Sequence, residues 1–320
     1  MNGQKPLRAD RTAGRAAKFA DPYWTAKGEP RAAVAPLSLK TLWFNTGTLC
    51  NLACDGCYIE SSPRNDRLAY LTLGEVEKFL SEALRNFPSV EEIGFTGGEP
   101  FMNPDIIAML DDALSVGYRA LVLTNAMTPM RRHRYALQAL NSRFRNRLAL
   151  RVSLDHYTQP IHEKVRGARS WTPALKGLKW LSDNKFDLAV AARMLNDETE
   201  ATMRRGFANL FSSEEIAVDA FDPHRLVLFP EMDAAADVPE ITENCWSILG
   251  KKPSDIMCAT SRMVIRRKGE DRPVVVSCTL LPYDQHFEMG QTLADANRLV
   301  RLNHPHCAKF CVLGGASCSA

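Results

Sequence analysis

Three cysteines stand close together early in the sequence: Cys50, Cys54 and Cys57, at C-x3-C-x2-C spacing directly after a short apolar segment. Three thiolates this close can hold one metal centre, yet a tetrahedral zinc ion or a cubane iron-sulfur cluster takes a fourth ligand. If the protein supplies only three, one position stays open, and open positions are where catalytic metal sites bind a substrate or cofactor. The spacing therefore favours a catalytic metal centre over a structural one.

A second motif is the stretch TGGEP at residues 96–100, which ends another apolar run. Paired glycines let the backbone approach a ligand closely, and the carboxylate of Glu99 can accept hydrogen bonds from an ammonium group. Taken alone, the same stretch is also an ordinary turn. The ligand interpretation needs a scaffold that brings the two motifs together.

Short apolar runs alternate with helical patterns from residue 42 onward, which predicts a parallel sheet with right-handed crossovers. The expected strands are residues 42–45, 93–96, 120–124, 148–154, 188–195 and 226–229. Six strands are fewer than the eight of a closed barrel. We therefore expect an α/β fold, an open six-stranded (β/α)6 partial TIM barrel, with its chemistry at the carboxyl ends of the strands.

The expected helices have recognisable ends. One begins with a capping box of Thr72 and Glu75, and the next begins at Asn103-Pro104 and ends at Gly117. Three more helices are expected at residues 129–141, 172–183 and 198–211. Their apolar stripes should pack on the sheet.

The cysteine loop and the GGE stretch together resemble the signature of the radical S-adenosylmethionine (radical SAM) superfamily, with Tyr58 as the aromatic residue after the last cysteine. The resemblance implies a 4Fe-4S cluster bound by Cys50, Cys54 and Cys57, with S-adenosyl-L-methionine (SAM) on the fourth iron. Such enzymes cleave SAM reductively to a 5'-deoxyadenosyl radical that abstracts hydrogen from the substrate. They take the electron from a low-potential donor such as flavodoxin or ferredoxin.

The same resemblance implies which residues bind SAM. The GGEP stretch would hold its amino group, Tyr58 would contact its adenine, and Ser153 and Arg166 would bind its ribose or carboxylate. The full set of candidates is Tyr58, Gly97, Gly98, Glu99, Pro100, Asn125, Ser153, Arg166 and Arg193. Ala126 departs from the family, which commonly has glycine after Thr-Asn at this point. Asp155 and His156 are expected to form a helix cap and a turn instead.

Cysteines return near the end of the chain, at positions 245, 258, 278, 307, 311 and 318. Cys258 and Cys278 bracket a segment that predicts a hairpin with Gly269 near its turn. The pattern resembles the SPASM and Twitch extensions of the superfamily, although C-x3-C stands where SPASM has C-x2-C. The count fits one auxiliary 4Fe-4S cluster, the Twitch arrangement, for which Cys258, Cys278, Cys307, Cys311 and Cys318 compete, and a structural zinc site is the alternative.

These observations divide the chain into an extension that packs on the core (residues 1–38), the partial-barrel core (39–235) and a small Twitch-like auxiliary-cluster domain (236–320). Cys245 is left over beside Trp246. It is either a thiol of the hydrophobic core or the donor of a hydrogen atom to a substrate radical, as in radical epimerases.

Composition limits the partners. The net charge of +3 is too small to indicate nucleic-acid binding, and no run of about 18 apolar residues or signal-peptide pattern indicates a membrane span or export. We expect a cytoplasmic protein. Nine cysteines, an odd number gathered at two ends of the chain, fit metal binding in a reducing compartment better than a disulfide framework.

Three functions remain open from the sequence. The first is a radical SAM oxidoreductase that oxidises a small-molecule or peptide substrate, or forms a bond in it, with help from the auxiliary cluster. The second is a redox-neutral epimerase with Cys245 as hydrogen donor. The third is an iron-sulfur or zinc scaffold that binds a partner without catalysis.

Overall fold

The protein is described by a computed structural model, which covers residues 17–195, 198–231 and 237–315. Among the predicted sites, Cys318 lies outside these ranges, as does the expected boundary at residues 235 and 236. No helix in the described part of the chain combines the length and the hydrophobicity that a membrane crossing requires.

In the described part of the chain the main sheet has nine strands, in the order β10-β9-β8-β2-β3-β4-β5-β6-β7. Its six consecutive members from β2 to β7 all pair in parallel. They are the six strands expected from the apolar runs: β2 (Thr41–Asn45), β3 (Glu92–Thr96), β4 (Arg119–Thr124), β5 (Leu148–Ser153), β6 (Asp187–Arg193) and β7 (Leu226–Phe229). The predicted α/β class with a mainly parallel sheet is confirmed.

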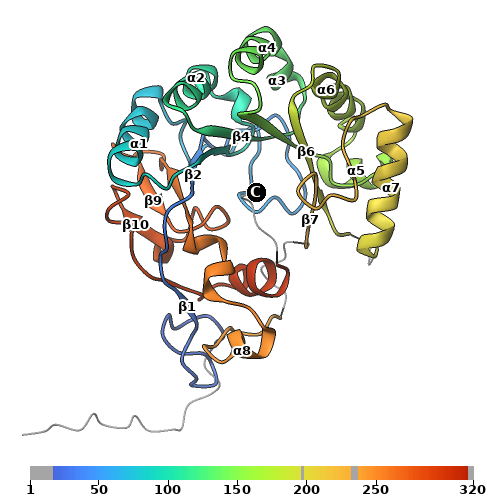
Figure 1. Ribbon diagram of the computed structural model, residues 1–320. Helices are drawn as coiled ribbons and strands as arrows, with labels where there is room; N and C mark the ends of the chain where they lie inside the picture. The colour runs from blue at the N-terminus through green and yellow to red at the C-terminus, as the bar shows by residue number, and fades with distance from the viewer. Residues whose placement is uncertain (1–16, 196–197, 232–236, 316–320) are drawn as a thin grey trace, which may run out of the picture.

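Figure 1 shows the sheet curving around a centre, with the helices on its outer side. They are α1 (Leu73–Asn86), α2 (Ile106–Val116), α3 (Thr128–Arg132), α4 (Arg134–Arg143), α5 (Gln159–Arg166), α6 (Trp171–Asp183) and α7 (Glu200–Ser213). The expected helix at 129–141 is divided into α3 and α4 at His133, and α5 was not expected. The helices cover the outer face of the sheet, so the carboxyl ends of the strands remain accessible for a site.

The helix ends test the predicted caps. The capping box of Thr72 and Glu75 is confirmed, and Gly117 ends α2 in a left-handed conformation with φ 116°. The predicted start at Asn103 is wrong: α2 begins after Asp105, and the Asn103 amide instead donates to the Thr46 and Leu71 carbonyls at 3.1 and 2.8 Å. Asn103 therefore fastens two loops together.

The C-terminal part continues the same sheet. Strands β8 (Ser261–Ile265) and β9 (Val274–Val276) form the predicted antiparallel hairpin, and Gly269 in its turn has φ 85°. Strand β8 also pairs in parallel with β2, and β10 (Glu288–Gly290) pairs with β9. The hairpin is thus joined to the barrel by backbone hydrogen bonds, and a separate auxiliary domain stays a prediction.

The N-terminal segment packs on the C-terminal region. Strand β1 (Ala33–Val34) pairs with β11 (Val300–Arg301), and the fully buried Arg31 pairs with Glu240 at 2.5 Å. The described part of the predicted extension therefore contacts residues beyond 236. The C-terminal region also contains α8 (Cys245–Leu249) and a π-helix, η5 (Cys307–Leu313).

Candidate active site and auxiliary cysteine site

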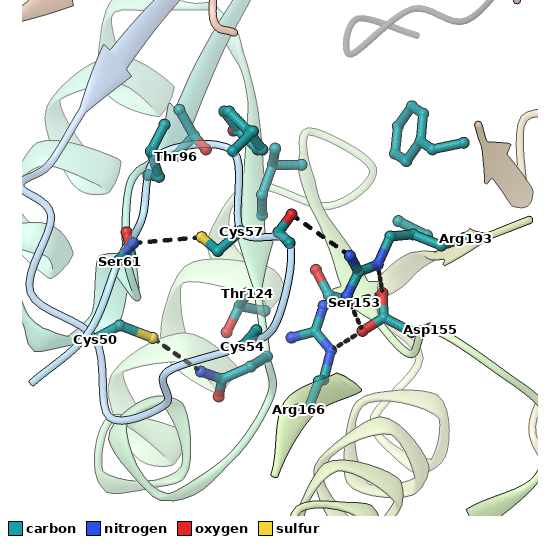
Figure 2. Close-up of a pocket in the computed structure, with 18 of the residues that line it drawn as sticks. Cys50, Cys54, Cys57, Ser61, Thr96, Thr124, Ser153, Asp155, Arg166 and Arg193 are labelled. Carbon is teal, nitrogen blue, oxygen red and sulfur yellow. Dashed lines mark hydrogen bonds and ion pairs between the residues drawn. The ribbon is translucent and has the colours of Figure 1, made fainter. Parts of the chain in front are cut away.

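A cavity lies at the carboxyl ends of the parallel strands, and it gathers most of the predicted site residues (Figure 2). Its walls come from the loop after β2 and from the ends of β3, β4, β5 and β6. The predicted residues that line it are Cys50, Cys54, Cys57, Tyr58, Gly97, Gly98, Asn125, Ser153, Arg166 and Arg193. With Arg166 at the end of α5, residues from six separate segments therefore meet at one place.

The two glycines of the GGE stretch serve the contact between loops. A Cβ atom on Gly98 would lie 2.3 Å from the Leu49 carbonyl oxygen, and one on Gly97, where φ is +144°, would lie 2.5 Å from the Gly47 oxygen. The backbone NH of Gly98 donates to Gly47 at 2.9 Å. The glycines thus let the turn after β3 support the backbone that leads into Cys50.

Glu99 is 1% exposed and is not among the residues that line the cavity, although Gly97 and Gly98 directly before it are. Its Oε1 accepts from the Thr124 hydroxyl at 2.8 Å and the Phe101 NH at 3.2 Å, and its Oε2 accepts from the Asn125 NH at 2.8 Å. Burial raises its pKa to about 7, although these hydrogen bonds act in the opposite direction. A carboxylate has about four acceptor positions, so one is left for an ammonium group.

The cysteine loop already supplies donors to its sulfurs. The Leu52 NH lies 3.4 Å from the Cys50 Sγ, and the Ser61 NH lies 3.4 Å from the Cys57 Sγ. Burial raises the pKa of Cys50 to about 12. Such a thiol stays protonated until a metal displaces the proton, and hydrogen bonds to sulfur are typical of cluster ligands.

The sulfurs do not converge on a single ion. In residues 17–195, 198–231 and 237–315, no three His, Cys, Asp or Glu side chains are close enough to hold one metal ion. A cubane cluster is itself several atoms wide and keeps its thiolates further apart than one ion does. The eight described cysteines are all free of disulfides. Cysteine thiolates are the ligands that iron-sulfur clusters take.

Asp155 joins the two arginines of the cavity (Figure 2). Its Oδ2 accepts from the Arg166 Nε at 2.6 Å, and its Oδ1 accepts from the Arg193 Nε at 3.1 Å. Burial by itself would raise the pKa of Asp155, but the two guanidinium groups lower it to about 2. The carboxylate is therefore ionised, and two positive charges share one negative charge.

Arg193 also reaches the cysteine loop. Its Nη1 and Nη2 both donate to the Asp55 carbonyl at 3.1 Å, between Cys54 and Cys57. The interpretation of Asp155 as a helix cap is wrong, because α5 begins after Thr158 and the carboxylate is used by the arginines. Sequence reasoning missed this function, although the acidic residue two positions after Ser153 was a usable signal.

His156 lies in the turn before α5, as expected. Its Nδ1 accepts from the Thr158 backbone NH at 3.0 Å, which leaves Nε2 to donate to Glu198 at 2.9 Å. The Tyr157 hydroxyl donates to the other oxygen of the same carboxylate at 2.9 Å. These bonds fix the turn that leads away from Asp155.

Four cysteines line a second, apolar cavity in the C-terminal region: Cys258, Cys278, Cys307 and Cys311. They come from a short 3-10 helix (Met257–Ala259), the segment after β9, and the π-helix, where Cys307 and Cys311 are four residues apart and share a face. Burial raises the pKa of Cys258 to about 11 and that of Cys307 to about 12. Of the five predicted ligands, only Cys318 lies outside the described residues.

The two cavities share a wall. Leu280 lines both, and Phe310, which lies between Cys307 and Cys311, lines the active-site cavity. Phe310 also stacks on Phe229 at the end of β7, with ring centroids 5.3 Å apart. The C-terminal region therefore closes one side of the active site.

Cys245 is not among the residues that line either cavity. It begins α8, and its Sγ lies 3.4 Å from the Thr242 backbone nitrogen. Figure 1 shows α8 beside the N-terminal segment, away from the sheet. The proposed hydrogen donor stays a prediction without a contact to the site that would need it, and the epimerase hypothesis has no geometric support.

A three-cysteine loop above a curved parallel sheet defines a cluster-binding partial-barrel enzyme. The Radical SAM superfamily matches residues 44–205, and the chain belongs to this superfamily. Its members use a 4Fe-4S cluster and SAM, so the predicted cofactors of the active site are confirmed at the level of the family.

Two curated relatives match parts of the chain. The antilisterial bacteriocin subtilosin biosynthesis protein AlbA of Bacillus subtilis (strain 168) is 30% identical over 193 residues, which cover 58% of this chain and 41% of AlbA. The S-adenosylmethionine-dependent nucleotide dehydratase of Selenomonas ruminantium is 34% identical over 76 residues, 24% of this chain and 26% of the dehydratase. The chain thus spans less than half the length of both relatives.

Solved structures share the fold. Streptococcus suis SuiB bound to SAM superposes with a TM-score of 0.56 at 14% identity, over 80% of this chain and 64% of SuiB. The anSMEcpe structure with bound SAM gives a TM-score of 0.57 at 13% identity, over 80% of this chain and 79% of that one. At these identities the likeness supports the partial-barrel fold alone.

Proposed function

We propose that this radical SAM enzyme carries an auxiliary 4Fe-4S cluster and uses it to oxidise its substrate or to form a bond in it. The observation that carries the proposal is the second cavity, which four cysteines line together with mainly apolar side chains and with Ser277 and His306. An auxiliary cluster can accept an electron from a substrate radical or anchor the substrate. The shared wall at Leu280 keeps the two cavities adjacent.

In the active site, Cys50, Cys54 and Cys57 would hold the first cluster. When bound, the cluster and SAM supply hydrogen-atom abstraction from the substrate. The chain's own residues prepare the site for this chemistry. Arg166 and Arg193 together carry one more positive charge than Asp155 neutralises, and this surplus suits the SAM carboxylate.

Apolar side chains complete the active-site cavity. Phe229, Leu280 and Phe310 are among the residues that line it. They would exclude water from the reacting atoms, which protects a reactive intermediate from side reactions. Tyr58 and Ser153 also line the cavity, in keeping with the proposed contacts to adenine and ribose.

For the substrate we propose a peptide, with a small molecule as the alternative. The support is the similarity to AlbA, whose name assigns it to bacteriocin biosynthesis. The match covers 41% of AlbA, so its activity is not carried over as a whole. A low-potential electron donor such as flavodoxin or ferredoxin is proposed as the redox partner.

Iron content tests the number of clusters. After anaerobic reconstitution we expect about eight irons per chain, since two 4Fe-4S clusters would be present. A variant with Cys50, Cys54 and Cys57 changed to Ala should keep about four, and so should the matched variant with Cys258, Cys278, Cys307 and Cys311 changed to Ala. About four irons in the unchanged protein would exclude the auxiliary cluster.

Product analysis tests the catalytic assignment. The reconstituted enzyme, reduced with dithionite in the presence of SAM, should release 5'-deoxyadenosine. The variant without Cys50, Cys54 and Cys57 is the control and should release none. If the reconstituted enzyme also releases none, the scaffold hypothesis gains over the catalytic one.

A further inference from the structure

Arg262 is a buried arginine beside the auxiliary cysteine cavity. It lies in β8, four residues after Cys258, and is 5% exposed. Its guanidinium donates only to backbone carbonyls, which belong to Ala296 (2.9 Å), Ser261 (2.7 Å), Arg298 (3.2 Å) and Cys258. No carboxylate of the described residues lies within ion-pair distance of it.

Two other largely buried arginines of the described chain, Arg31 and Arg166, differ in this respect. Arg31 pairs with Glu240 at 2.5 Å, and Arg166 pairs with Asp155 at 2.6 Å. Burying a charge without an opposite charge is costly, because the group loses its hydration. Carbonyl dipoles orient the Arg262 guanidinium, but they do not neutralise its charge.

The acidic groups that act on Arg262 are the thiols of Cys258 and Cys278. Burial lowers the pKa of Arg262, yet a guanidinium remains protonated in proteins. The cysteines carry negative charge only when they are ionised, as they are when they bind a metal. The missing counter-charge is therefore one that a bound cluster with its thiolates would bring.

We infer that Arg262 is a positioning residue of the auxiliary site, whose charge favours binding of the anionic cluster and raises its reduction potential. The inference rests on the proposed auxiliary cluster. Net charge is one of the quantities that set the potential of iron-sulfur clusters, and a nearby cation stabilises the reduced, more negative state. The hydrogen bonds from its guanidinium to four backbone carbonyls keep this cation in place.

The test isolates the auxiliary cluster. In the full chain with Cys50, Cys54 and Cys57 changed to Ala, only that cluster remains, and its potential is measured by a redox titration followed by electron paramagnetic resonance. Arg262→Gln should shift the reduction equilibrium at least tenfold toward the oxidised state, which is about 59 mV for one electron. Arg262→Lys keeps the charge without the fork and should shift it less than threefold.

Each outcome separates the two proposals. A parent chain without iron after reconstitution would remove the auxiliary cluster before any Arg262 variant is made. A parent that binds iron, with an unchanged potential in Arg262→Gln, would overturn the role of Arg262 alone. Arg262→Met is a second neutral variant. Loss of iron in both neutral variants but not in Arg262→Lys supports the charge, whereas equal loss in Arg262→Lys assigns the residue to the fold only.

Discussion

In the active-site cavity two arginines share one carboxylate, whereas beside the auxiliary cavity the buried Arg262 donates to backbone carbonyls and has no carboxylate partner among the described residues. The first site must admit SAM and a substrate, so its charges are arranged before they arrive. Asp155 holds both arginines without a ligand. The second site is lined by cysteines, by apolar side chains and by Ser277 and His306. In our proposal a bound cluster would complete its charge balance.

The difference separates two ways of building a cluster site. In the active site the loop with Cys54 and Cys57 is tied to the barrel by Arg193, through the carbonyl of Asp55. The strength of this tie depends on an ion pair between protein groups. In the auxiliary site the cysteines come from three segments, so the cluster itself would join them.

The largest expected effect is that of Asp155→Ala. Removing one partner of a buried ion pair leaves uncompensated charge, which costs about 3–5 kcal/mol. Arg166 and Arg193 would both lose their partner. We expect the free energy of unfolding, measured in urea, to fall by about this amount, and the first site to bind less iron while the auxiliary site keeps its own.

The control for this prediction is Asp66→Ala, which removes an exposed partner of Lys268 and should leave the unfolding midpoint unchanged. The pH dependence offers a second check. Because the pKa of Asp155 is lowered from 3.8 to about 2, its contribution is present above pH 3.8 and is lost as the pH falls toward 2. Equal free energies of unfolding for Asp155→Ala and the unchanged protein at pH 7 would contradict the stabilising role of the Asp155 ion pairs.

Asp155 also shows where sequence reasoning stopped. The six strands and the cysteine loop were predictable, because apolar runs and cysteine spacing are local patterns. The choice between a helix cap and an ion pair depended on where Arg166 and Arg193 lie relative to Asp155, from 11 to 38 positions along the chain. The positions of Arg166 and Arg193 in space are set by how α5 and β6 pack. A local sequence pattern carries no information about this packing.

The sequence indicated the four cysteines that line the second cavity, but not the strands around them. The cysteine count indicated a second cluster, and four of the candidate ligands line one cavity: Cys258, Cys278, Cys307 and Cys311. That β8 pairs with β2 could not be read from the hairpin pattern, since pairing partners far apart in sequence leave no local signal. The lack of a carboxylate partner for Arg262 among the described residues could not be predicted either, because it is visible only in three dimensions.

A smaller effect is expected for Gly98→Ala, which tests whether the active-site loop depends on close backbone packing. The added Cβ would lie 2.3 Å from the Leu49 oxygen, so backbone must move, at a cost of about 1–3 kcal/mol. The matched control is Gly74→Ala in α1, where the nearest atom is 4.0 Å away. Equal unfolding curves for both variants would show that the two loops can separate freely.

The smallest expected effect concerns SAM binding and Glu99. An ammonium group binds the ionised carboxylate, and burial places the pKa of Glu99 at about 7. Since the ionised fraction rises about tenfold between pH 6 and 8 for such a group, the affinity for SAM should rise by about that factor. Equilibrium dialysis with the reconstituted protein measures it, and Glu99→Gln should bind more weakly with no such rise.

The proposed auxiliary cluster would be the internal control for this experiment, because cysteines would hold it and no carboxylate of the described chain lines its cavity, although His306 does. Its iron content should stay constant from pH 6 to 8, so a change confined to SAM affinity belongs to the active site. A flat profile in the unchanged protein would mean that Glu99 only fastens the turn after β3 to Thr124 and Asn125. The SAM amino group would then be bound by backbone carbonyls instead of by the Glu99 carboxylate. Close packing, as between the turn after β3 and the loop after β2, would hold the ligand in the active site.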